Sequence, residues 1–129
     1  MSNAIIYIDR SEIREGKLRE LKQAIHGLVE FVDKHEPQLT FYGFYLDEEA
    51  SRMTVAAVHP DSASLELHME VGGPEFRKLT GLIRLQIIEV YGRPSDKARE
   101  QLQQKAQMLG GARVVVDELH AGFARFPAR

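Results

Sequence analysis

The chain has 129 residues, of which 43% are hydrophobic and 28% charged, and its formal net charge at pH 7 is −2. This balance is typical of one soluble globular domain, and the small net charge gives no electrostatic reason to expect a nucleic acid or an anionic membrane as a partner. No cysteine is present, which excludes disulfides, zinc–thiolate sites and thiol nucleophiles.

The N-terminus carries neither the basic nor the apolar segment of a signal peptide, and no run of about 18 apolar residues occurs that could span a membrane. We therefore expect a cytoplasmic protein. Residues 1–4 resemble a cloning remnant, and residues 5–129 are expected to form a single domain. Because Asn3 is the only asparagine and tryptophan is absent, this domain has neither residue type.

A strand and a long helix are predicted first. Residues 4–9 are short in span and rich in β-branched and aromatic side chains, which is typical of a strand. Ser11 is a suitable N-cap for the helix that follows. From Glu15 to His35 the apolar residues recur every three or four positions, and Pro37 ends the pattern. These apolar positions are Leu18, Leu21, Ile25, Leu28 and Val32.

Two strands follow, at residues 38–46 and 52–58, joined by the polar hairpin loop 47–51. Successive side chains of a strand point to opposite faces, and in both segments both faces are apolar. A sheet with one face in water would instead alternate apolar and polar residues. Both faces of this part of the sheet are therefore expected to be covered.

A second helix is predicted to begin at residues 60–62, with Asp61 or Ser62 as its N-cap. The Gly72-Gly73-Pro74 segment is predicted to end it, before a short helical turn over residues 75–79.

The fourth strand is predicted at residues 82–91, with Ile83, Leu85 and Ile87 on one face, while Arg84 and Gln86 interrupt the other. A last helix is predicted from Pro94-Ser95 to Leu109, where two glycines end it. Residues 113–116 and 121–126 read as one or two further strands.

The order strand, helix, strand, strand, helix, strand predicts an α+β fold with a ferredoxin-like split βαβ sheet, extended by a C-terminal helix and strand or strands. Helices usually cover only one face of such a sheet. Since the second and third strands are apolar on both faces, we expect a homodimer that packs sheet against sheet. The alternative is a monomer in which the last helix covers the open face.

With this order of elements, the chain resembles the dimeric α/β-barrel superfamily that includes the antibiotic biosynthesis monooxygenases. The resemblance covers residues 5–91 and rests mainly on Asp61–His68 (DSASLELH), followed by Pro74-Glu75-Phe76 and Leu79. It implies a cleft for a flat apolar or aromatic molecule beneath the second helix. Some members oxidise phenols with oxygen and without metal or flavin, and others cleave haem. The members that use asparagine and tryptophan for these reactions are no template for this chain.

His68 is the candidate catalytic residue. It shares a helical face with Leu65, Met69 and Gly72, and this face is expected to lie toward the sheet. A neutral imidazole, with an ordinary pKa of about 6.5, can orient a phenol or accept its proton. The alternative is a core or cleft-edge histidine that only binds a backbone carbonyl.

Four further residues are candidate substrate-binding residues. His59 is expected at the mouth of the cleft, where the third strand ends, and Arg84 interrupts a strand face where it can hold a polar ligand group or pair with Glu89 or a partner subunit. Tyr7 and Phe76 belong to the aromatic supply for a pocket, although most aromatic residues of strands are core.

No metal site is predicted, because the spacing of His59, Asp61 and His68 matches no compact zinc motif. The turn at residues 59–61 is better read as one whose carboxylate caps the following helix. No cofactor motif is present either: the paired glycines are not part of a phosphate-binding loop. His26 and His35 are expected to be structural or exposed, and His120 can line a cleft.

Together these features predict a small dimeric α/β-barrel protein that binds a hydrophobic or aromatic small molecule, with a cofactor-independent monooxygenase as its activity. The alternative is a non-catalytic ligand-binding or structural barrel. A regulatory sensing domain is less favoured, because no DNA-binding helical region accompanies the sheet.

Overall fold

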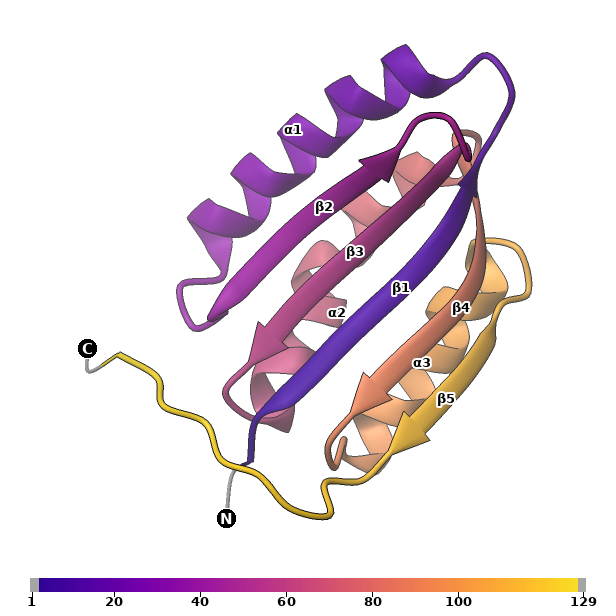
Figure 1. Ribbon diagram of the computed structural model, residues 1–129. Helices are drawn as coiled ribbons and strands as arrows, with labels where there is room; N and C mark the ends of the chain where they lie inside the picture. Colours follow the sequence, from indigo (N-terminus) through magenta and orange to yellow (C-terminus); the bar gives the residue numbers. More distant parts are fainter. Residues whose placement is uncertain (1–2, 128–129) are drawn as a thin grey trace.

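The computed structural model describes residues 3–127, so that Met1 and Ser2 of the expected cloning remnant lie outside the described residues. One five-stranded sheet carries three helices on one of its faces (Figure 1). The predicted α+β class and ferredoxin-like sheet are confirmed. In chain order the elements are β1 (Ile5–Ile13), α1 (Leu18–His35), β2 (Phe41–Asp47), β3 (Arg52–His59), α2 (Ser62–Phe76), the 3₁₀ turn η1 (Arg77–Leu79), β4 (Ile83–Tyr91), α3 (Asp96–Met108) and β5 (Arg113–Asp117).

The strands lie side by side in the order β2-β3-β1-β4-β5. The first four are antiparallel to their neighbours, whereas β5 runs parallel to β4 after the crossover through α3. The extra C-terminal helix and one extra strand are therefore confirmed. A second strand at residues 121–126 is wrong, because the chain leaves the sheet edge after Asp117 and has no strand beside it to pair with (Figure 1).

Two predicted helix boundaries are wrong. Ser11 does not cap α1: β1 continues to Ile13 and buries Ser11, and α1 begins after Lys17 without a side-chain cap. The Gly72-Gly73-Pro74 segment does not end α2, which continues to Phe76 with Pro74 inside it. Pro74 removes one backbone hydrogen bond from the last turn of α2, and the burial of Phe76 offsets that cost.

A β-bulge divides the faces of β4. Arg10 pairs with Ile87 but Ser11 pairs with Leu85, so Gln86 is an extra residue on β4. The predicted continuous face of Ile83, Leu85 and Ile87 is therefore wrong. Ile83 and Leu85 are buried before the bulge, and after it the buried positions are Ile88 and Val90, while Ile87 is only partly buried.

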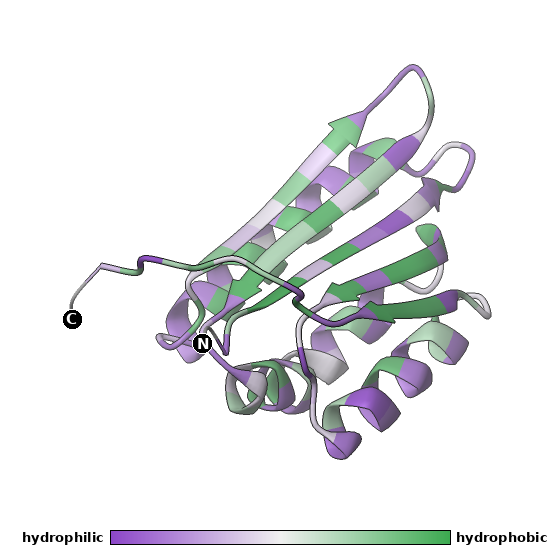
Figure 2. Ribbon diagram, turned by 60° about the horizontal axis from the view of Figure 1, so that its bottom comes forward, coloured by the Kyte–Doolittle hydropathy of each residue, from purple (hydrophilic) through white to green (hydrophobic). Residues whose placement is uncertain are grey.

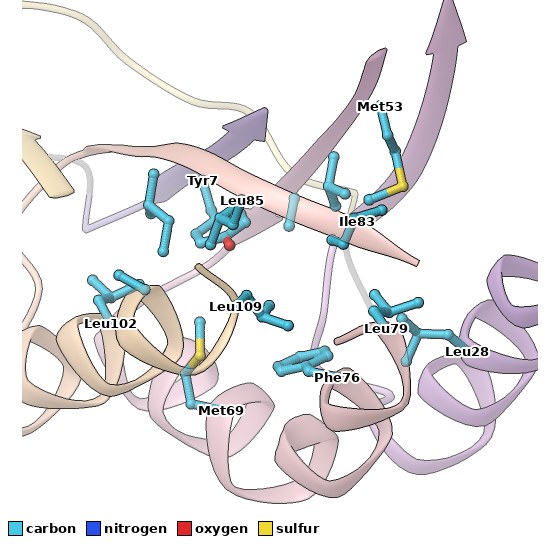
Figure 3. Close-up of a cluster of buried hydrophobic side chains, with 14 of the residues drawn as sticks. Tyr7, Leu28, Met53, Met69, Phe76, Leu79, Ile83, Leu85, Leu102 and Leu109 are labelled. Atoms are coloured by element: carbon cyan, nitrogen blue, oxygen red, sulfur yellow. The ribbon is translucent and has the colours of Figure 1, made fainter. Parts of the chain in front are cut away.

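The core lies between the sheet and the helices. Figure 3 shows sheet residues such as Tyr7 and Leu85 above Met69, Phe76 and Leu102 of the helices. Figure 2 shows the three helices on the same side of the sheet. The alternative that the last helix covers the open face is therefore wrong. None of the helices within residues 3–127 combines the length and apolarity needed to cross a membrane.

Candidate functional site

Seven of the buried polar side chains between the sheet and the helices are grouped here as the buried polar cluster. Each is at most 9% exposed. Burying a titratable group away from water is costly unless partners compensate it, so each of these positions needs an explanation. The members are Tyr7 and Asp9 of β1, Glu36 at the end of α1, His59 at the end of β3, Ser64 and His68 of α2, and Lys105 of α3.

His68 pairs with Glu36. Its Nδ1 lies 2.7 Å from Glu36 Oε1, and since a carboxylate can only accept, Nδ1 carries the proton and donates it. The lone pair of the neutral ring then lies on Nε2. Burial lowers the pKa of His68, and the hydrogen bond to Glu36 opposes this. The partner is a carboxylate and not a backbone carbonyl, and this hydrogen bond holds the ring in one tautomer.

His59 lies beside His68, with 5.4 Å between the ring centroids. Its Nδ1 is 2.7 Å from Ser64 Oγ, and its buried Nε2 has no hydrogen-bond partner within residues 3–127. Burial lowers the pKa of His59 to about 3, with further contributions from His68 and Lys105. The predicted location at a cleft mouth is wrong, because His59 is fully buried. The predicted cap is confirmed: the backbone N–H of Ser64 donates to Asp61 Oδ1 at 2.9 Å.

Tyr7, Asp9 and Lys105 form the second half of the cluster. Tyr7 donates its hydroxyl proton to Asp9 Oδ2 at 2.5 Å, and Lys105 Nζ donates to Tyr7 Oη at 2.8 Å. Lys105 Nζ is also 3.5 Å from Asp9 Oδ2. Burial raises the pKa of Tyr7, and the charge of Asp9 raises it further. Burial lowers the pKa of Lys105, whereas Asp9 opposes this. The group therefore brings an amine, a carboxyl and a phenol hydroxyl into contact inside the core.

The ring of Phe76 touches both halves of the cluster. Its centroid is 5.1 Å from that of His68, and Lys105 Nζ lies 4.1 Å from it, over the ring. Phe76 also folds back against Gly72, where an added Cβ would stand 2.6 Å from the ring. Figure 3 shows this ring lying below Leu109, between α2 and the sheet. Tyr42 adds an edge contact to His68 at 5.2 Å.

Two hollows meet at Phe76 and Lys105. One is a groove of about 630 Å³ between α2 and α3, which we call the α2–α3 groove. The other, the inner cavity, has a volume of about 10 Å³ and lies against Asp9 and Tyr42. Phe76 and Lys105 line both hollows. The inner cavity holds at most a water molecule, so an organic molecule reaches the cluster only if Phe76 moves.

Four of the five sequence-predicted site residues come together: His68, His59, Tyr7 and Phe76. Arg84 does not join them. Its side chain is 55% exposed, and its Nη2 lies 3.6 Å from Glu12 Oε2.

The ion-pair partner considered for Arg84, Glu89, is bound instead by Arg10 and by the Tyr91 hydroxyl. His26 and His35 are exposed on α1. His120 lines a different hollow, together with Phe123 of the C-terminal tail. Within residues 3–127, no group of three or more side chains is arranged to hold a metal ion.

Four residues of the cluster, Asp9, Glu36, Ser64 and Lys105, were not predicted from the sequence, and the three charged ones each carry a signal. Glu36 follows Val32 by four positions and so continues the apolar stripe of α1. Lys105 follows Leu102 by three positions and lies on the buried stripe of α3. Asp9 alternates in phase with buried Tyr7 along β1. A charged residue in phase with a buried stripe is the feature that identifies them.

No family description and no curated protein matches the sequence. Solved structures do. MupZ from Pseudomonas fluorescens superposes with a TM-score of 0.74 and 19% identity over 96% of each chain. SnoaB, a cofactor-independent oxygenase from Streptomyces nogalater, superposes with a TM-score of 0.61 and 12% identity over 73% of this chain and 96% of its own. A Bacteroides thetaiotaomicron protein described as a candidate antibiotic biosynthesis monooxygenase superposes with a TM-score of 0.54. The two chains are 19% identical over 68% of this chain and 85% of the other.

The chain has the antibiotic biosynthesis monooxygenase-like fold. The resemblance stated from the sequence is thereby confirmed for the fold. The match to MupZ spans 96% of this chain and so necessarily includes α3, the helix that carries Lys105. At these identities the antibiotic biosynthesis monooxygenase-like proteins share the fold, and the activity has to be argued from the site.

Proposed function

We propose that this protein is a small enzyme that binds a hydrophobic or aromatic molecule between its sheet and helices and removes a proton from it. His68 is the general base and Glu36 orients it. The observation that carries this proposal is the buried hydrogen bond of 2.7 Å between the two side chains, next to the aromatic ring of Phe76.

Stability alone does not account for this arrangement. Buried pairs of this kind contribute little or nothing to stability compared with apolar residues of similar volume. A core of this size has ample apolar residues to close the same space. Titratable groups with pKa values displaced by burial, gathered around one point, are instead a common feature of catalytic sites. The cluster is therefore better explained by chemistry than by packing.

The chemistry follows from the tautomer. With its Nδ1–H donated to Glu36, His68 accepts the substrate's proton at Nε2. The bond that breaks is an O–H or an activated C–H of the substrate, and its electron pair stays on the substrate as an anion. The Glu36 carboxylate stabilises the imidazolium that forms. An electron-rich anion of a phenol can react with molecular oxygen without metal or flavin, and SnoaB is a cofactor-independent oxygenase.

A non-catalytic ligand-binding barrel is the second candidate. Its structural form, with no bound ligand, is favoured by the inner cavity of about 10 Å³, which leaves no room for any organic molecule while Phe76 is in place. The absence of asparagine after residue 3 and of tryptophan also favours it.

We also propose a homodimer that packs sheet against sheet. The face of the sheet opposite the helices exposes large apolar side chains, with 44% of Ile6, 44% of Phe41 and 55% of Tyr45 accessible. Exposed apolar side chains gathered on one face are typical of an interface between proteins. The cytoplasmic location stays a prediction, as does a substrate-binding role for Arg84.

Oxygen uptake tests the proposed activity. A panel of quinols and naphthols is supplied to the wild-type protein, to His68→Gln and, as a control, to His35→Gln, which changes an exposed histidine of α1. Gln at position 68 can still donate to Glu36 but cannot act as a base. We expect uptake by the wild type and the control, and a loss of about 10²-fold or more in His68→Gln.

Uptake that is unchanged in His68→Gln would show that His68 is not the base. Ligands that raise the melting temperature without any oxygen uptake would favour the non-catalytic barrel.

A further inference from the structure

We propose that Lys105 is a second functional group of this site, whose ammonium binds the anionic oxygen of a phenol or enol substrate. The substrate enters through the α2–α3 groove and takes the place of the Phe76 ring. This inference rests on the proposed function, because the anion forms when His68 accepts the proton. In this proposal α3 contributes a substrate-binding residue, Lys105, to the site.

Lys105 is held where a bound anion would need it. Its ammonium has three N–H donors, of which Tyr7 Oη takes one at 2.8 Å, and Asp9 Oδ2 lies at 3.5 Å. This leaves donor capacity for an oxygen atom of a bound molecule. Because the side chain is only 9% exposed, little water screens its charge. A fixed cation in such a place stabilises developing negative charge without prior rearrangement.

The position of Phe76 defines the shape of the substrate. Its ring contacts the His68 ring at 5.1 Å between centroids and lies 4.1 Å from Lys105 Nζ. A substrate ring in that place would therefore touch the base and the cation at once. Phe76 shows that the site accommodates one flat six-membered ring against these two groups. An aromatic ring that bears a hydroxyl group is the ligand that uses both.

The α2–α3 groove supplies the route. Phe76 and Lys105 form its inner end, and Met69, Pro74 and Met108 give it apolar walls for the remainder of a substrate. Pro74 has no N–H to donate within α2, and two glycines precede it, so the last turn of this helix is held weakly. Phe76 belongs to that turn and can leave the cluster by its movement.

The proton transfer balances without any other reactant. The O–H bond of the substrate breaks, the proton goes to His68 Nε2, and the electron pair remains on the substrate oxygen. Lys105 keeps its own protons and donates hydrogen bonds to that oxygen, while Tyr7 stays bound to Asp9. Lys105 therefore favours the ionised substrate, and its removal should affect ionisation more than aromatic binding.

The test uses 4-nitrophenol, whose ionisation is visible in its absorbance. Phe76→Ala provides the background, because the truncation leaves an apolar space of ring size beside Lys105. In this background we compare Lys105→Met with Lys97→Met, which removes an exposed lysine of the same helix. We expect bound 4-nitrophenol to have an ionisation constant at least about tenfold higher with Lys105 present than in Lys105→Met. Lys97→Met should match its parent.

Equal ionisation of bound 4-nitrophenol with and without Lys105 would overturn the inference, as would no binding to Phe76→Ala at millimolar concentration. Lys105→Arg, which keeps the charge, covers the case in which Lys105→Met does not fold, and it should retain most of the effect. His68→Gln separates the two proposals. If its oxygen uptake falls while 4-nitrophenol ionises equally with and without Lys105, only the role of Lys105 is wrong.

Discussion

Acid should destabilise this protein through its buried histidines, and His59 gives the magnitude. Its pKa is about 3 in the folded chain, against about 6.5 in an unfolded one. Between these pH values the unfolded chain binds a proton that the folded chain excludes, so the free energy of unfolding falls as the pH falls. The slope approaches about 1.4 kcal/mol per pH unit. From pH 7.5 to pH 5 the loss due to His59 is about 2 kcal/mol.

Urea unfolding at pH 7.5 and pH 5, followed by circular dichroism, measures this loss for the wild type, for His59→Gln and for His26→Gln as a matched control at an exposed position. His59→Gln should lose about 2 kcal/mol less than the wild type over this interval. The control should behave as the wild type. His68 contributes further acid sensitivity in all three proteins, because its pKa is also lowered. Equal losses in the wild type and His59→Gln would show that His59 is not a source of the acid sensitivity.

Three further outcomes are expected. Gly72→Ala should destabilise the protein by about 1–3 kcal/mol, because its Cβ would stand 2.6 Å from the Phe76 ring. The added Cβ of Gly73→Ala meets nothing within 4 Å, so this variant should be neutral or stabilising. Thermal melts that rank the two variants the other way would contradict the packing of Phe76 against Gly72. Phe76→Ala should lower the free energy of unfolding by about 3–5 kcal/mol and leave a cavity that binds benzene-sized ligands, which a thermal-shift assay detects. A variant that gains no such affinity would show that no ring-sized cavity forms. Light scattering at micromolar concentration should give a dimer, and a clean monomer mass of 14.6 kDa would exclude the interface around Phe41 and Tyr45.

The fold was predictable because its signals are local. The stripe of α1 and the apolar runs of β2 and β3 have the periods of a helix and of strands, and these patterns survive in the structure. The errors arose where tertiary contacts override local preference. Ser11 has the chemistry of a cap but lies in β1, and the bulge at Gln86 depends on the pairing of two strands.

The site was only partly predictable because its contacts join distant segments. His68 was found from its own helix, but its partner Glu36 lies 32 positions earlier. Lys105 and Tyr7 are 98 positions apart and meet only because α3 packs against β1. No sequence spacing encodes such a contact. What the sequence does contain is the phase of each charged residue relative to a buried stripe.

His68 is proposed to accept a proton from a bound phenol. Long-range ¹H–¹⁵N NMR of the histidine rings measures it directly, with and without 4-nitrophenol at pH 7. In the free protein, we expect a neutral His68 ring protonated at Nδ1, because Glu36 accepts from that nitrogen. When bound 4-nitrophenol ionises, its proton should pass to His68, and the adjacent negative charge should stabilise the imidazolium that forms. A His68 ring that stays neutral while 4-nitrophenol is bound would show that His68 does not accept the proton.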